Sequence, residues 1–197
     1  MAATIDIAKC IELGNQEIKN GDARSARKWF KKAVRTAPNN AVALDGLAWT
    51  YFMEQQYGIA KRLLIRAIKA DPGFAEAYTD LGCVMHSLGR SNAAERLHKR
   101  CLEIEPERHD AHMNLGVLYL HQKRFADAEK SLARAVTCEP GDADTYQLLG
   151  EAKLYQLDFD GACETFRACL ALDSKNIEAD LLLTYALMER GDAAHQV

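Results

Sequence analysis

Histidines are the residues of this chain whose types could support metal or acid–base chemistry. His109, His112 and His121 lie close together in the sequence, and His86 precedes them. A metal site needs ligands that converge with a narrow geometry, and the spacing of these histidines does not supply it. The chain also lacks a Ser-His-Asp order, a nucleophile elbow, a glycine-rich phosphate loop and an HExxH motif. We therefore expect no enzyme activity, no metal and no cofactor.

Six cysteines could form disulfides or bind zinc, but no two of them make a CxxC pair. Without such spacing neither a disulfide framework nor a zinc site is indicated. Free cysteine is among the most often buried residue types. We therefore interpret the six as reduced thiols in a cytosolic protein. They are Cys10, Cys83, Cys101, Cys138, Cys163 and Cys169.

The four prolines reveal the elements that position these residues. Each lies 34 residues after the one before, at Pro38, Pro72, Pro106 and Pro140. A single globular core gives no reason for such even spacing, whereas a stack of identical helix pairs does. With the proline at position 32, the spacing predicts five units and a partial sixth: 7–40, 41–74, 75–108, 109–142, 143–176 and 177–197.

Other positions recur with the same period and have packing roles. Position 7 is leucine in all six units, and position 8 is glycine in four of them. Position 20 is alanine and position 27 is alanine or cysteine in each of the first five. Small residues at positions 8 and 20 let two helix backbones approach closely. The large residues at positions 7 and 24 fill the space beside that contact.

Glycines and acids mark where helices end and begin. A proline cannot continue a helix, so the second helix of each unit should end near position 32. Gly21, Gly89 and Gly191 are expected to end the first helix of their units. Asp22, Asp158 and Asp192 can cap the following helix, and Asp142 and Asp144 are also expected at a helix cap.

This pattern resembles the tetratricopeptide repeat (TPR) family from Ile7 to Gly191. The resemblance implies an all-α fold, a right-handed α-solenoid superhelix of helix-turn-helix units with about eleven helices. We expect residues 1–197 to form one such solenoid. The pattern departs from the family at the C-terminal end. Ser174 stands where a proline is expected, and the sixth unit has only its first helix.

The apolar stretches are too short to span a bilayer, and the first residues have neither a basic segment nor an apolar core. We therefore expect a cytoplasmic protein, at most peripheral to an internal membrane or assembly.

The net charge of −3 hides an asymmetry between the two halves of the chain. Residues 1–100 hold 16 Lys/Arg and 10 Asp/Glu, and residues 101–197 hold 9 and 18. Three interpretations stay open: a solvated outer face, end-to-end attraction between copies of the chain, or an acidic partner such as an anionic membrane surface or an acidic protein segment. Nucleic acid is not expected, because the acidic half would repel it.

Helix geometry separates two faces of the first helix in each unit. Positions 4, 7, 8 and 11 face the second helix, and positions 2, 5, 9, 12 and 13 point about 140° away. In the TPR family this second face lines a concave groove that binds peptides or helices. The alternative is that these residues pack against the next unit's first helix. The candidate groove residues are Asp45, Trp49, Phe52, Met53, Glu76, His86, Asp110, Met113, Leu120, His121, Asp144, Glu151 and Tyr155.

The expected partner is a protein segment with apolar side chains and basic flanks, because the groove combines aromatic and Met anchors with acids. TPR domains that hold a terminal carboxylate use Lys, Asn or Arg at the groove positions. Here only Asn15 fits, and Ile11 and Glu76 stand where lysines would be.

Self-association is expected at the two ends of the solenoid, which would make the chain a homo-oligomer. An uncovered apolar helix marks an interaction surface, and the last unit has no second helix to cover its first. The candidate residues are Leu181, Leu182 and Tyr185, with basic Arg27, Lys28 and Lys31 at the other end.

These features favour a non-enzymatic adaptor or scaffold. Similar stand-alone TPR proteins of bacteria serve pilus assembly, secretion and the coating of magnetosome membranes. The alternatives are the substrate-recognition arm of a larger enzyme, such as a glycosyltransferase, and a regulatory module that binds a small ligand or metal.

Overall fold

The computed structural model describes residues 6–194, with side chains described as far as residue 191. The described residues form eleven α-helices. They are α1 Ile7–Lys19, α2 Ala23–Thr36, α3 Ala41–Met53, α4 Tyr57–Ala70, α5 Ala75–Ser87, α6 Ser91–Ile104, α7 His109–His121, α8 Phe125–Cys138, α9 Ala143–Leu154, α10 Phe159–Leu172 and α11 Ile177–Ala194. The prediction of an all-α chain with about eleven helices is confirmed.

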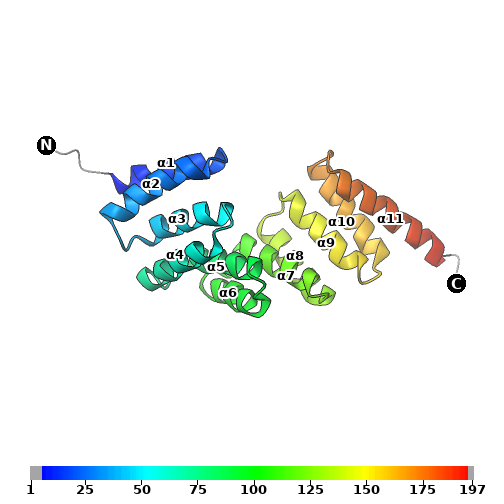
Figure 1. Ribbon diagram of the computed structural model, residues 1–197. Helices are drawn as coiled ribbons and strands as arrows, with labels where there is room; N and C mark the ends of the chain where they lie inside the picture. The colour runs from blue at the N-terminus through cyan, green and yellow to red at the C-terminus, as the bar shows by residue number, and fades with distance from the viewer. Residues whose placement is uncertain (1–5, 195–197) are drawn as a thin grey trace. The chain divides into compact units, whose positions relative to one another are not determined.

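The helices follow one another as antiparallel pairs, and within each of two compact units the pairs contact their neighbours in sequence (Figure 1). Two compact units result, one ending at Glu105 with α1–α6 and one starting at Pro106 with α7–α11. Within the first unit, α1 also contacts α3, and α3 contacts α5. Within the second unit, α9 likewise contacts α7 and α11. The first helix of each pair starts at the residue where the 34-residue period places a new unit.

Each helix pair is held by a large side chain against a glycine or alanine. A Cβ placed on Gly14 would lie 2.7 Å from the Phe30 ring, and one on Gly150 would lie 2.5 Å from the Phe166 ring. Positions 20 and 27 are fully buried in all five complete pairs. The predicted packing roles of positions 8, 20 and 24 are therefore confirmed.

The turn inside each pair has one repeated backbone geometry. The residue at position 15 has a positive φ: 76° at Gly21, 58° at Gln55, 71° at Gly89, 59° at Lys123 and 63° at Leu157. The next residue donates its backbone N–H to a carbonyl five residues earlier, as Asp22 does to Glu17 at 2.9 Å. This is the Schellman motif that closes a helix C-terminus.

The second helices end where the prolines predict, and the second helix that lacks a following proline ends at the same position. Thr36 is the last residue of α2 and Pro38 follows two residues later. Helix α10 ends at Leu172 in the same way although Ser174 replaces the proline. There Asp173 Oδ1 accepts a hydrogen bond from the Lys175 backbone N–H at 3.0 Å. The equivalent Asp71 accepts from the Gly73 N–H at 2.9 Å with Pro72 between them, so this side chain–backbone turn forms with or without the proline.

Three of the expected helix caps are present among the described residues. The side chains of Asp22 and Asp158 accept backbone N–H groups of the second helix, at 2.9 Å from Ser25 and 3.0 Å from Gly161. Asp142 caps α9 by accepting from the Asp144 backbone at 3.3 Å.

The expected turn at Gly191 is wrong, because α11 continues through Gly191 and Asp192 to Ala194. In the other pairs, packing of the second helix offsets the helical hydrogen bonds that the turn gives up. Within residues 6–194, α11 packs on α9 and α10 but has no second helix of its own pair, so the helical ladder continues instead.

Candidate functional site

In the first unit, the face of the first helices that points away from their partners encloses a hollow of about 230 Å³. Helices α1, α3 and α5 supply most of its wall. We call it the Trp49 hollow, and its lining is Asn15, Ile18, Phe30, Asp45, Gly46, Trp49, Glu76 and Asp80. Phe30 and Ile18 provide apolar surface to the hollow, and the carboxylates of Asp45, Glu76 and Asp80 also line it.

Trp49 is held in position by neighbouring aromatic rings. Its ring stacks on Phe52 with centroids 4.9 Å apart, and Phe52 meets Tyr57 at 5.6 Å. Phe52 and Tyr57 also pack on the core of this unit. The indole is therefore a rigid apolar surface at the edge of the hollow, which suits an anchor residue of an interface.

The carboxylates give the Trp49 hollow a negative potential. Asp45 on α3 is only 5% exposed, and Glu76 and Asp80 project from α5 on the neighbouring pair. Negative side chains that converge in a partly dry hollow attract a cationic group more strongly than the same charges on an open surface.

In the second unit, the corresponding face encloses a hollow of about 270 Å³. It lies between α7 and α9 and extends to the turn after α7. We call it the Tyr155 hollow, and its lining is Val117, Leu120, His121, Lys123, Phe125, Leu148, Glu151 and Tyr155. Phe125 and Tyr155 stack with ring centroids 4.8 Å apart, so this hollow is more apolar than the first.

Glu151 is the acid of the Tyr155 hollow and is partly desolvated. Burial raises the pKa of its carboxyl, and the nearby charge of Glu178 raises it further. A hydrogen bond from Gln147 Nε2, at 3.1 Å, acts in the opposite direction. Burial thus makes the ionised form of Glu151 less favourable. A cation brought by a partner would stabilise that form, because an opposite charge favours ionisation.

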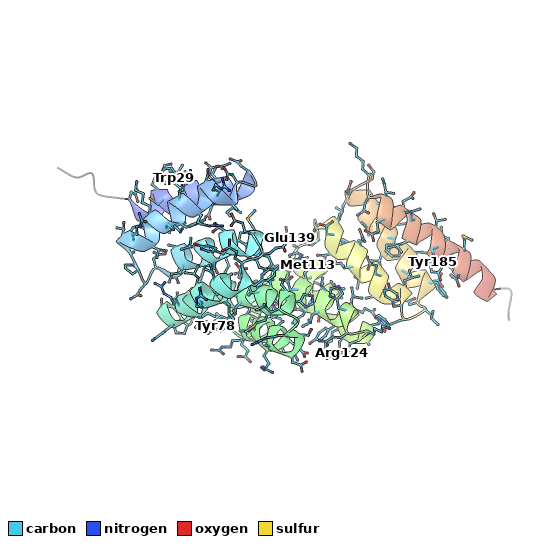
Figure 2. The ribbon with its side chains drawn as sticks, viewed as in Figure 1. Trp29, Tyr78, Met113, Arg124, Glu139 and Tyr185 are labelled. Carbon is cyan, nitrogen blue, oxygen red and sulfur yellow. The ribbon has the colours of Figure 1, made fainter. Side chains whose placement is uncertain are left out.

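The predicted groove residues divide between these hollows and their surroundings. Asp45, Trp49 and Glu76 line the first hollow, and four of the others line the second. The remaining six lie outside both linings: Phe52, Met53, His86, Asp110, Met113 and Asp144. Asp110 is engaged locally, since it accepts a hydrogen bond from Arg108 Nε at 2.8 Å. Met113 lies on α7 (Figure 2).

Sequence reasoning missed position 6, which supplies Gly46, Asp80 and Leu148 to the hollows. On a helical wheel this position lies about 20° from position 13, so the same geometry contained the signal. It also missed Lys123 and Phe125, which follow α7 and reach the hollow from the turn and from α8.

Among the predicted self-association residues, Arg27 is engaged inside the first unit. Its guanidinium donates to the Thr50 carbonyl at 2.9 Å, pairs with Glu54 at 2.9 Å and lies 4.2 Å from the centre of the Tyr51 ring. These contacts tie α2 to α3. Lys28 and Lys31 are exposed.

Helix α11 carries a row of exposed apolar side chains, the α11 stripe, which includes Tyr185 (Figure 2). Its members follow helical spacing along one face: Ile177 74%, Leu181 65%, Tyr185 50% and Met188 66% exposed. They occupy positions 1, 5, 9 and 12 of the last pair. In the inner pairs Asp45 and Thr79, at position 5, are both buried. Leu182 packs on the core instead.

The histidines have structural partners in the second unit. His109 lies 3.4 Å from Glu139 through Nδ1 and 3.2 Å from Asp142 through Nε2, and so joins α7 to the turn before α9. His112 Nε2 contacts the Pro106 carbonyl at 2.9 Å. Within residues 6–194 no group of three His, Cys, Asp or Glu side chains is arranged to hold a metal ion. No helix of that range is long and apolar enough to cross a membrane.

The antiparallel helix pairs and their repeated small-residue contacts define an α-solenoid repeat protein. Models of the tetratricopeptide repeat match residues 17–83, 85–152 and 143–176. The chain therefore belongs to the tetratricopeptide repeat family. It is a protein-binding scaffold with no evident catalytic domain.

Several solved structures resemble the chain over most of its length. A TPR protein of Thermus thermophilus has a TM-score of 0.78 at 21% identity, covering 93% of this chain and 100% of its own. MamA has a TM-score of 0.70 at 25% identity, covering 87% and 97%. PilW, described as a type IV pilus biogenesis factor, has a TM-score of 0.84 at 20% identity, covering 98% and 89%. No curated protein matches the sequence significantly.

Proposed function

We propose that the chain is a non-enzymatic adaptor that binds protein segments in the Trp49 and Tyr155 hollows. The observation that carries the proposal is the composition of the two linings. Each joins aromatic or aliphatic side chains to acids on the first helices, three carboxylates in the Trp49 hollow and Glu151 in the Tyr155 hollow. Apolar anchors of a partner would fill the hollows, and its Lys or Arg flanks would pair with the acids.

The two hollows differ in what they accept. The Trp49 hollow has three carboxylates and suits a cationic side chain that lies against the indole. The Tyr155 hollow has Glu151 as its only acid and offers Val117, Leu120 and Leu148 to an apolar side chain. A segment that carries both kinds of residue fits better than one with either alone.

The structural neighbours support the kind of process proposed. PilW is described as a pilus biogenesis factor. MamA matches this chain in fold over nearly its whole length. A role in holding components of a bacterial assembly together is part of the proposal.

A co-precipitation experiment tests it with matched variants. The wild type is compared with Trp49→Ala, with Glu76→Lys/Asp80→Lys and with the control Glu12→Lys/Glu103→Lys. The control reverses two exposed acids of the same unit outside the hollow. We expect the same prey proteins to be lost from both hollow variants and kept by the control. Prey retained by both hollow variants would contradict the proposal.

Self-association is a second function, favoured by the α11 stripe. Four large apolar side chains in a row on one exposed helix face are more than scattered surface hydrophobics. A second copy of the chain would cover them.

A further inference from the structure

The second helices of the first unit share an outer face that is strongly cationic. Positions 18, 22, 25, 26 and 29 of α2, α4 and α6 are all exposed. Eleven of these fifteen positions hold Lys or Arg. The eleven are Arg24, Lys28, Lys31, Lys32, Arg35, Arg62, Arg66, Lys69, Arg96, Lys99 and Arg100. We call this set the cationic outer face.

The repeat geometry does not require these charges. The same five positions of α8 and α10, in the second unit, hold only three cations, Lys130, Arg134 and Arg167. Two of the other positions are the acids Asp160 and Glu164. Helices with the same packing thus tolerate small or acidic residues there, so the cations of the first unit serve something other than the fold.

Few of the cations are neutralised within the first unit. Lys99 pairs with Glu95 at 2.7 Å and Arg100 with Glu103 at 2.6 Å, both on α6. The five members of this face on α2 make no ion pair among the described residues. On that helix Arg24, Lys28, Lys31 and Arg35 follow the spacing of one helical face, where like charges repel each other.

The distribution of the cations decides which anionic partner fits. Helices α2, α4 and α6 each contact their own first helix and, among the described residues, do not contact one another, so the charges spread over three elements and not along one line. An acidic segment that follows one helix would leave the cations of the other two unmatched. A plane of headgroups can meet all three, and Ile65, which is 48% exposed among them, can contact the acyl boundary.

We propose that the cationic outer face binds an anionic membrane surface. It lies on the second helices, whereas the two hollows are formed mainly by the first helices. Each Lys or Arg brought near an anionic bilayer raises partitioning by about fivefold, and salt screens the effect. A scaffold held in this way would keep its hollows free for protein partners.

Vesicle sedimentation with the full chain tests the proposal. Vesicles that contain phosphatidylserine are compared with pure phosphatidylcholine vesicles at low and physiological salt. We expect binding only to the anionic vesicles, weakened by salt. Lys28→Glu/Lys31→Glu should lower the partition coefficient more than tenfold, and the milder Lys28→Gln/Lys31→Gln should lower it less.

The matched control is Lys130→Glu/Arg167→Glu, which makes the same charge change at positions 22 and 25 of the second unit. It should keep vesicle binding. Equal binding to both vesicle types, or an equal loss in the control, would overturn the proposal. Tighter binding of polyglutamate or duplex DNA to the same face would overturn it too, in favour of an acidic protein or a nucleic acid.

Discussion

At the scale of single residues, the turn of each helix pair requires a left-handed backbone conformation that glycine adopts most easily, but the residue there is not always glycine. Position 15 adopts a positive φ in all five pairs, yet only Gly21 and Gly89 are glycines there. Gln55, Lys123 and Leu157 hold the same geometry with a side chain. Residues with a Cβ are strained in this region, and branched or bulky apolar ones have no local hydrogen bond to compensate.

Replacing Leu157 with glycine should therefore stabilise the protein. We expect a gain of about 1 kcal/mol, the cost of placing an L-residue in the left-handed region. The side chain is 72% exposed, so little packing is lost. Urea unfolding measures the change, and Gly89→Ala is the matched opposite, expected to lose a similar amount. A Leu157→Gly variant less stable than the wild type would show that the exposed side chain makes a contact that matters.

Glu151 gives the stability of the second unit a pH dependence of known sign. Its pKa is raised in the folded state, chiefly by burial, so the folded protein binds a proton more tightly than the unfolded chain does. The resulting penalty is absent at pH values below the unfolded pKa and complete above the folded one. Wild-type stability should thus fall, relative to a neutral variant, as the pH rises from acidic to neutral.

The Glu151→Gln variant tests this by thermal unfolding across that range. We expect it to be more stable than the wild type at neutral pH and equal to it in acid, below the ordinary glutamate value of 4.5. Glu164→Gln, on an exposed position of α10, is the control and should have no such trend. A stability difference that is constant with pH would mean that the charge of Glu151 is not its cause.

At the scale of the helix pair, one contact between positions 8 and 24 sets how closely two helices approach. Glycine stands opposite a phenylalanine ring in the pairs α1–α2 and α9–α10. In the pair α3–α4, Ala48 and Leu64 occupy the same positions, and both are buried. An alanine is thus compatible with a leucine partner, while a flat ring packed on the glycine leaves no room for a Cβ.

Gly150→Ala should consequently cost more than Gly116→Ala. A Cβ at residue 150 would lie 2.5 Å from the Phe166 ring, and one at residue 116 would lie at least as close to the Leu132 side chain. A leucine can shift to the arrangement that Leu64 adopts beside Ala48, whereas the Phe166 ring has no such precedent in this chain. We expect a loss of about 2–3 kcal/mol for Gly150→Ala, as for other overpacked cores, and less for Gly116→Ala. Urea unfolding of both variants, with Gly150→Ala/Phe166→Leu as a rescue, measures the difference. Equal losses at the two sites would contradict this account.

At the scale of the whole molecule, the features that recur in every repeat could be predicted from the sequence, and contacts found in a single repeat could not. The period determines which residues are buried, so the burial of Ala26, Ala60 and their equivalents could be predicted from the sequence. Arg27 could not, because its engagement depends on Thr50, Tyr51 and Glu54 in the next pair. Part of each hollow was also missed, because Phe30, Lys123 and Phe125 come from second helices or a turn and lie outside the first-helix face that the period identifies.

The two outermost first helices of the chain differ in character, and this bears on how copies would associate. In α1, positions 3, 6 and 10 are Lys9, Glu12 and Gln16, all exposed, with Lys9 and Glu12 paired at 2.9 Å. The same positions of α11 are Ala179, Leu182 and Ala186, which are wholly or partly buried. A polar α1 is a poor surface to stack on the α11 stripe of another copy, so an end-to-end filament of helix pairs is disfavoured.

Association through the stripe alone would instead be a closed contact between two α11 helices. The acids Glu178, Asp180 and Glu189 flank the stripe and would come near their counterparts, so salt should strengthen such a dimer by screening repulsion. Pairing of the basic first unit with the acidic second unit of another copy would weaken with salt. Light scattering should then show a mass that rises toward twice 21.9 kDa with concentration, and more readily at high salt. Leu181→Asp/Met188→Asp should stay at the mass of one chain, and Leu172→Asp on α10 should behave as the wild type. A mass that keeps growing beyond the dimer, or that falls as salt is added, would favour the end-to-end arrangement.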